Sequence, residues 1–153
     1  MANTYTQLYL QFVFADQNRQ SLIKPGWESG LYKYIAGIVK NNEHKVIAIN
    51  GMPDHIHLFI GFHTTQSIAG LMMKVKGGSS EWVNAQSFVK GKFKWQEGYG
   101  AFSYGKSQVD QVYRYVLNQK QHYSKRTFYE EYTELLKKFD VSFDERYVFK
   151  PIE

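Results

Sequence analysis

The spacing of apolar residues along this chain alternates between two patterns, and the order of the changes restricts the fold more than any other feature. Residues 4–14 combine β-branched and aromatic residues with partial alternation, which predicts a strand. From Leu31 to Val39 apolar residues recur at i, i+3, i+4, i+7 and i+8, the stripe of an amphipathic helix. The same criteria predict strands at 45–50, 55–62 and about 101–104, and helices at about 66–84 with an interruption at Gly77 and Gly78, from about 107 to 123, and at 128–138.

The predicted order is strand, helix, strand, strand, helix, strand, followed by extra helices. This order is the split βαβ pattern of a ferredoxin-like α+β sandwich, an antiparallel sheet with helices on one face. A chain of 153 residues is long enough to bury one adequate core. Because the chain has no linker, repeat or low-complexity tract, we expect residues 1–153 to form a single domain.

The chain contains no cysteine, which excludes several classes of protein. Disulfide scaffolds, Cys-ligated zinc, iron–sulfur clusters and thiol nucleophiles all require the missing side chain. Any metal must therefore be held by His, carboxylate, amide or water. The first residues lack the basic start and continuous apolar run of a signal peptide, and nowhere do 18 apolar residues follow one another. We expect a cytoplasmic protein with no membrane partner.

Positive charge is concentrated in the second half of the chain. The net charge is +5, and residues 74–126 carry ten bases against three acids, interleaved with aromatic residues. Such a surface suits a single-stranded nucleic acid, because aromatic rings stack on unpaired bases while lysines neutralise phosphates. The alternative is a solvated face above tucked aromatic rings. The predicted DNA contacts are Lys74, Lys76, Lys90, Lys92, Lys94 and Trp95.

Two histidines lie two residues apart in the predicted strand at 55–62. His55 and His57 should project from the same face, while Ile56 and Leu58 point the other way. Two imidazoles on one rigid strand form half of a metal site and require a third protein ligand from elsewhere. The alternative is a pair of partly exposed histidines on a polar strand face.

A second candidate cluster lies on the helix predicted from about 107 to 123. Tyr115, Gln119 and His122 fall at i, i+4 and i+7 and share one stripe beside the valine stripe that packs on the core. The tyrosine hydroxyl can serve as a nucleophile, and the glutamine oxygen can bind a hard cation. The alternative is that Tyr115 only packs.

Three motifs together resemble one family. PDHIHL on a strand, WQEGYGAFSY and the helix YVLNQKQHY occur in the order and at the separations found in the small HUH-type single-strand DNA transposases of bacterial insertion sequences, the IS200-like family. The resemblance implies that His55 and His57 bind a metal, that Tyr115 is the nucleophile and that Gln119 is the third metal ligand. It also places His122 near the site without assigning it a role.

The resemblance further implies an activity. Such an enzyme binds hairpins in the single-stranded ends of an insertion sequence, and cleaves and rejoins the strand through a 5′-phosphotyrosine intermediate with Mg²⁺ or Mn²⁺. Similar proteins form homodimers, in which the tyrosine helix of one subunit can complete the HUH site of the other. Two alternatives remain open on the same fold: a non-catalytic single-stranded DNA or RNA binder, and a domesticated relative that processes repeats. A two-histidine phosphoesterase would need two His-x-Thr/Ser elements, and only His63 to Thr65 fits.

Overall fold

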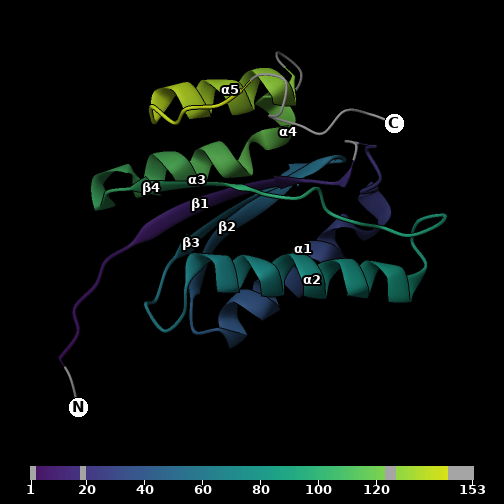
Figure 1. Ribbon diagram of the computed structural model, residues 1–153, viewed down its shortest axis with the longest axis horizontal. Coiled ribbons are helices and arrows are strands. Elements are labelled where there is room, and N and C mark those ends of the chain that lie inside the picture. Colours follow the sequence, from purple (N-terminus) through teal and green to yellow (C-terminus); the bar gives the residue numbers. More distant parts are fainter. Residues whose placement is uncertain (1–2, 18–19, 123–126, 145–153) are drawn as a thin grey trace.

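The computed structural model describes residues 3–17, 20–122 and 127–144, and for His122 the backbone alone. The elements follow the predicted order (Figure 1). They are β1 (Tyr9–Ala15), α1 (Pro25–Asn41), β2 (Lys45–Met52), β3 (His55–Gly61), α2 (Ile68–Gln86), β4 (Gly100–Tyr104), a short 3-10 turn (Lys106–Gln108), α3 (Val109–Leu117), α4 (Gln119–His122) and α5 (Phe128–Lys138).

The four strands form one antiparallel sheet in the order β2-β3-β1-β4. The two central strands are the first and third along the chain, which is the arrangement of the split βαβ unit. The α+β, ferredoxin-like prediction is therefore confirmed.

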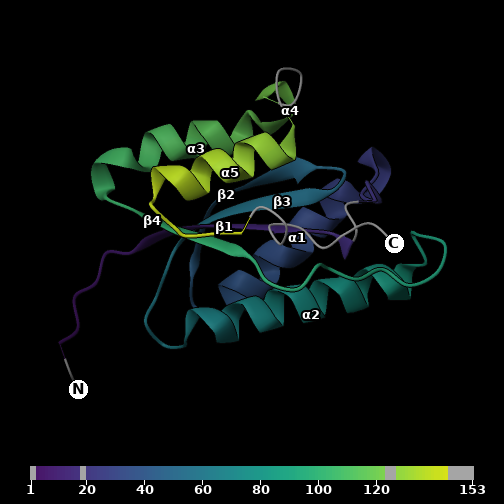
Figure 2. The same cartoon turned by 45° about the horizontal axis from the view of Figure 1, so that its top comes forward.

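Helices cover both faces of the sheet (Figures 1 and 2). Leu10, Phe12 and Phe14 of β1 pack with α1 and α2 on one face. Val13 and Ala15 point to the opposite face, where α3 and α5 lie. Because both faces are covered, β1 and β3 are buried along almost their whole length, and the face under α3 and α5 can hold polar side chains away from water.

The structure differs from the sequence prediction in two details, one at the start of a strand and one at a pair of glycines in a helix. β1 begins at Tyr9 rather than at Thr4. Helix α2 runs without a break through Gly77 and Gly78, so the predicted interruption was wrong. A Cβ on Gly78 would lie only 3.0 Å from Cδ1 of Ile38 in α1, so the missing side chain allows the two helices to approach closely.

The predicted helix from about 107 to 123 is divided into two. Helix α3 ends at Leu117, and Gln119 begins the separate short helix α4. The side chain of Asn50 in β2 donates a 2.9 Å hydrogen bond to the carbonyl oxygen of Leu117, and this bond satisfies a carbonyl at the helix end. Tyr115 and Gln119 therefore lie on different helices. None of the helices in the described ranges is long and apolar enough to cross a bilayer.

Asp16 directly follows β1 and lies beside the turn between β2 and β3. Its side chain is fully buried, and its carboxylate accepts hydrogen bonds from the backbone N–H groups of Gln20 and Leu22 at 2.8 and 3.2 Å. Its own N–H donates to the carbonyl oxygen of Asp54 at 2.9 Å. The loop after β1 is thereby tied to the residue that precedes β3.

Asp16 is expected to make folding stability depend on pH. Burial raises the pKa of Asp16 from 3.8 to about 7, so between these values the folded protein holds a proton that the unfolded chain has released. The free energy of unfolding should fall as pH rises through this window, by up to about 4 kcal/mol from this residue. Asp16→Asn is neutral throughout and should flatten the slope, which urea unfolding across the window will measure. An equal slope in both proteins would contradict this assignment.

Candidate active site

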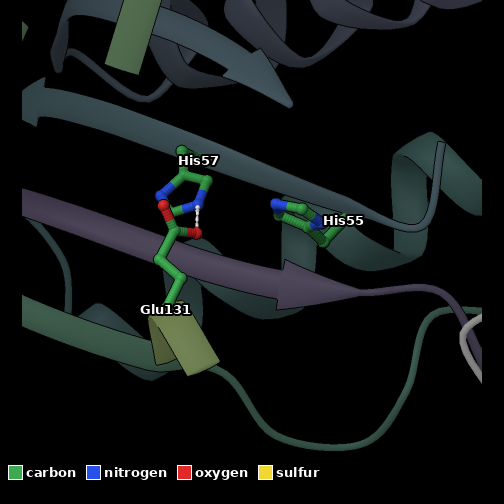
Figure 3. Close-up of side chains that lie close together, drawn as sticks. All are labelled: His55, His57 and Glu131. Carbon is green, nitrogen blue, oxygen red and sulfur yellow. Dashed lines mark hydrogen bonds and ion pairs between the residues drawn. The ribbon is translucent and has the colours of Figure 1, made fainter. Parts of the chain in front are cut away.

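Strand β3 carries two imidazoles on the sheet face that α3 and α5 cover. Figure 3 shows both rings together with the side chain of Glu131. His55 and His57 are both fully buried, with ring centroids 5.2 Å apart. Their burial differs from the partly exposed strand face considered as the alternative above. Gly51 in the adjacent strand helps to position them, because a Cβ there would collide with the carbonyl oxygen of His55.

The ring of His55 is held by a carboxylate and an aromatic side chain. Nδ1 lies 2.7 Å from Oδ1 of Asp54, and the ring of Phe128 stacks on it at 3.7 Å. Burial lowers the pKa of His55, which favours the neutral ring, although the Asp54 hydrogen bond opposes this shift. With the Nδ1 proton directed to Asp54, Nε2 is the nitrogen that can bind a metal.

The ring of His57 has a polar partner at each nitrogen. The amide Nε2 of Gln11 lies 2.8 Å from Nδ1, and Oε1 of Glu131 lies 3.0 Å from Nε2. Both partners are buried. Three elements therefore meet at this ring: β1 through Gln11, β3 through His57 and α5 through Glu131.

Glu131 is the functional candidate that the sequence analysis missed. It is 1% exposed and lies in the first turn of α5, where the positive end of the helix dipole favours a carboxylate. Besides His57, it accepts hydrogen bonds from the hydroxyl of Tyr115 and, at 3.4 Å, from Nε2 of Gln119. The signal was available: in FYEEYTELL, Glu131 occupies the i+3 position of the apolar stripe that begins at Phe128, and a lone acid on a buried stripe is unusual.

These side chains fit a divalent ion. One ligand atom each from His55, His57 and Glu131 lies within 4.8 Å of the others. Oε1 of Gln119 is buried and has no hydrogen-bond partner among the described residues. Carboxylate and amide oxygens suit Mg²⁺ and Mn²⁺, and imidazole nitrogens suit transition metals such as Zn²⁺, so the ligand types fit a divalent ion and do not select one. The predicted set of His55, His57 and Gln119 is thus brought together, with a carboxylate added.

Tyr115 lies beside these ligands in the same chain. Its ring is 6.0 Å from that of His57, and its hydroxyl donates to Glu131. A cavity of about 310 Å³ adjoins it, with a lining that includes Tyr104, Gln111, Tyr115, Glu131 and Lys138. The side chain of Tyr115 is therefore next to an open space. The side chain of His122, which was also predicted near the site, lies outside the described residues.

The predicted DNA contacts fall into two groups, which are four exposed lysines and two residues that hold a loop in place. Lys90, Lys92 and Lys94 are exposed on the loop after α2. Lys74 is exposed and donates to Oδ1 of Asn42 at 3.1 Å.

Lys76 and Trp95 instead hold the loop after α2 in place. Nζ of Lys76 donates to the carbonyl oxygens of Gln96 and Gly98 at 2.6 and 2.7 Å, and burial lowers its pKa. Trp95 is only 8% exposed, and its indole N–H donates to Oγ of Ser79 at 2.8 Å. Because its ring packs in the core against Phe14, a stacking contact between Trp95 and a base does not fit this structure.

Comparison with known proteins gives consistent findings. The family model described as "Transposase IS200 like" matches residues 4–119. The crystal structure of a candidate transposase from Deinococcus radiodurans R1 superimposes with a TM-score of 0.63 at 22% identity, covering 78% of this chain and 95% of that one. A REP-associated tyrosine transposase bound to a REP hairpin gives a TM-score of 0.57 at 13% identity, covering 77% and 70%. No curated protein matches the sequence.

Proposed function

Because the chain belongs to the IS200-like transposase family, we propose that it cleaves and rejoins single-stranded DNA with Tyr115 as the nucleophile. One observation carries the proposal: the Tyr115 hydroxyl, the His57 ring and the Gln119 amide all contact a single buried carboxylate, Glu131, within one chain. Packing alone would not require four polar side chains at one buried point, since each loses its hydration there.

Glu131 supports the first step by accepting the phenol proton. The Tyr115 oxygen attacks the scissile phosphorus, and its proton passes to the Glu131 carboxylate to which the hydroxyl already donates. A phosphorus–oxygen bond to Tyr115 forms while the bond to the 3′ oxygen breaks, and that oxygen takes a proton from water. The products are a 5′-phosphotyrosine linkage and a free 3′-hydroxyl. In the reverse direction a 3′-hydroxyl attacks the phosphorus and loses its proton to water. The phosphorus–oxygen bond to Tyr115 breaks, and Glu131 returns the proton to the Tyr115 oxygen.

His55, His57, Glu131 and the Gln119 carboxamide oxygen are the side chains that would hold Mg²⁺ or Mn²⁺. When bound, such an ion supplies Lewis-acid stabilisation of the charge on the scissile phosphate. Asp54 and Phe128 keep the His55 ring in the orientation that leaves Nε2 available. Helix α5 covers the site, and its side chains Glu131 and Phe128 are both buried there.

DNA recognition is assigned to the exposed lysines. Four lysines are exposed and would neutralise phosphates of a folded single strand: Lys74, Lys90, Lys92 and Lys94. Such contacts position DNA without reading its sequence. A hairpin at the element end is the proposed ligand, supported by the REP hairpin bound to the REP-associated relative. Each chain offers one Tyr115, whereas transposition needs more than one cleavage, so we expect a homodimer.

The test is covalent capture of labelled single-stranded DNA. Oligonucleotides from the DNA flanking the gene, labelled at the 3′ end, are incubated with the protein and Mg²⁺ or with EDTA, then resolved on a denaturing gel. The 5′-phosphotyrosine linkage should transfer the 3′ label to the protein in Mg²⁺ only, while 5′-labelled DNA should yield a shorter free fragment. A non-catalytic binder would instead shift the DNA on a native gel and leave no labelled protein with any divalent ion.

A further inference from the structure

Gln11 is a fully buried polar residue that the proposed reaction leaves unused. It lies in β1 on the face that carries the histidines. Its amide nitrogen is 2.8 Å from Nδ1 of His57, and its amide oxygen accepts a 2.8 Å hydrogen bond from the hydroxyl of Tyr104 in β4. The two ends of this one amide therefore connect the His57 ring to a phenol that lines the cavity beside Tyr115.

This arrangement places the His57 proton on the nitrogen that faces the other ligands. Nδ1 accepts from the Gln11 amide, so in the neutral ring Nε2 carries the hydrogen and donates it to Glu131. A metal at Nε2 needs the lone pair of that nitrogen, and the proton must then move to Nδ1. There it would face the N–H of Gln11, and two donors would oppose each other at a buried contact.

Rotation of the Gln11 amide by half a turn removes this conflict. The amide oxygen then accepts from Nδ1–H of His57, and the amide nitrogen donates to the oxygen of Tyr104. Tyr104 can serve either orientation because a hydroxyl both donates and accepts, and burial raises the pKa of Tyr104 to about 12, which keeps it protonated. Since Tyr104 lines the cavity, its proton can turn toward that space.

We propose that Gln11 is a positioning residue that selects the metal-binding form of His57: its amide rotates as the ring proton moves from Nε2 to Nδ1. The inference rests on the proposed function, because it supposes that His57 binds a divalent ion. Gln11 acts through His57 and touches neither the DNA nor the reacting phosphate. Loss of the hydrogen-bond partner of a metal-binding histidine typically changes metal affinity by about 10- to 100-fold.

Two substitutions of opposite chemistry test this role. Gln11→Leu fills similar space without an acceptor and should weaken Mn²⁺ binding about 10- to 100-fold, measured by electron paramagnetic resonance near pH 8. Gln11→Glu always offers an acceptor to Nδ1–H and should bind Mn²⁺ at least as tightly as the wild type. A purely structural role predicts weaker binding in both variants, because Glu also buries a new charge.

The matched control is a histidine–glutamine pair away from the candidate site, in which His44 is buried and Gln66 is half-buried. Nε2 of His44 lies 2.6 Å from Oε1 of Gln66, and neither residue belongs to the candidate site. Gln66→Glu therefore makes the same chemical change beside a histidine that binds no metal, and it should leave Mn²⁺ affinity unchanged.

Nitrogen-15 NMR of the histidine rings reads the tautomer directly. Addition of Mg²⁺ to the wild-type protein should move the His57 proton from Nε2 to Nδ1. A Mg²⁺-loaded protein that keeps the proton on Nε2, or a Gln11→Glu variant that binds Mn²⁺ as weakly as Gln11→Leu, would overturn the role of Gln11 alone, provided that the Tyr115 adduct still forms. Wild-type protein that binds no Mn²⁺ and forms no adduct would overturn the proposed function as well.

Discussion

Replacing Tyr115 by Phe is expected to abolish the covalent protein–DNA adduct while leaving single-stranded DNA binding intact. The substitution removes the attacking oxygen and the hydrogen bond to Glu131 but keeps the ring beside His57. Because the phenol oxygen is the proposed nucleophile, adduct formation should fall by more than about 10³-fold. The labelled-oligonucleotide assay measures the adduct, and fluorescence anisotropy with the same oligonucleotide measures binding.

The same helix supplies the control for this experiment. Tyr113 lies two residues before Tyr115 in α3 and is 41% exposed, on a different side of the helix. Tyr113→Phe should form the adduct at the wild-type rate. If the adduct survives in Tyr115→Phe and disappears in Tyr113→Phe, the nucleophile has been assigned to the wrong tyrosine.

Glu131→Gln is expected to produce the second largest loss. The neutral amide can still accept a hydrogen bond from Tyr115, but it cannot take the phenol proton and it is a weaker ligand than a carboxylate. Loss of general-base assistance alone typically costs about 10²- to 10⁴-fold in rate. Single-turnover cleavage, measured over a range of Mg²⁺ concentrations, should show both a lower maximal rate and a higher Mg²⁺ requirement.

Glu81→Gln is the matched control for this substitution. Glu81 is exposed on α2, on the opposite side of the sheet. Its substitution should change neither the maximal cleavage rate nor the Mg²⁺ requirement. If Glu131→Gln needs more Mg²⁺ but reaches the wild-type maximal rate, Glu131 is a metal ligand and is not the proton acceptor. A rate unchanged at every Mg²⁺ concentration would contradict both roles.

Glu131 also extends the site beyond the part of the chain that defines the family match. That match covers residues 4–119 and so includes His55, His57, Tyr115 and Gln119, but it ends before α5 begins. Helix α5 is nevertheless integral to the site, because Glu131 bridges His57 and Tyr115 while Phe128 stacks on His55. Shortening the chain before α5 would therefore expose the histidines and remove the carboxylate.

The spacing of apolar residues predicted helices and strands well where the spacing was regular over a long segment. The stripes at 31–39 and 128–138 correspond to α1 and α5, and the strand at 55–62 corresponds closely to β3. The predictions were wrong where a distant partner decided the outcome. Helix α3 ends where Asn50 in β2 donates a hydrogen bond to the carbonyl oxygen of Leu117. Helix α2 passes through its glycines because Ile38 of α1 packs against Gly78.

The candidate site shows the same division between local and distant information. Two-residue spacing placed His55 and His57 on one face, since side chains alternate along a strand. The sequence by itself therefore determined the strand-helix order, the shared face of the histidines and, through the motif, the candidate tyrosine. Only the tertiary structure decided that Glu131 and Gln11 meet His57, because they lie 74 and 46 residues away and come together only when α5 and β1 pack at the same sheet face. Side-chain burial and hydrogen bonding between distant segments depend on that packing, and no local periodicity encodes it.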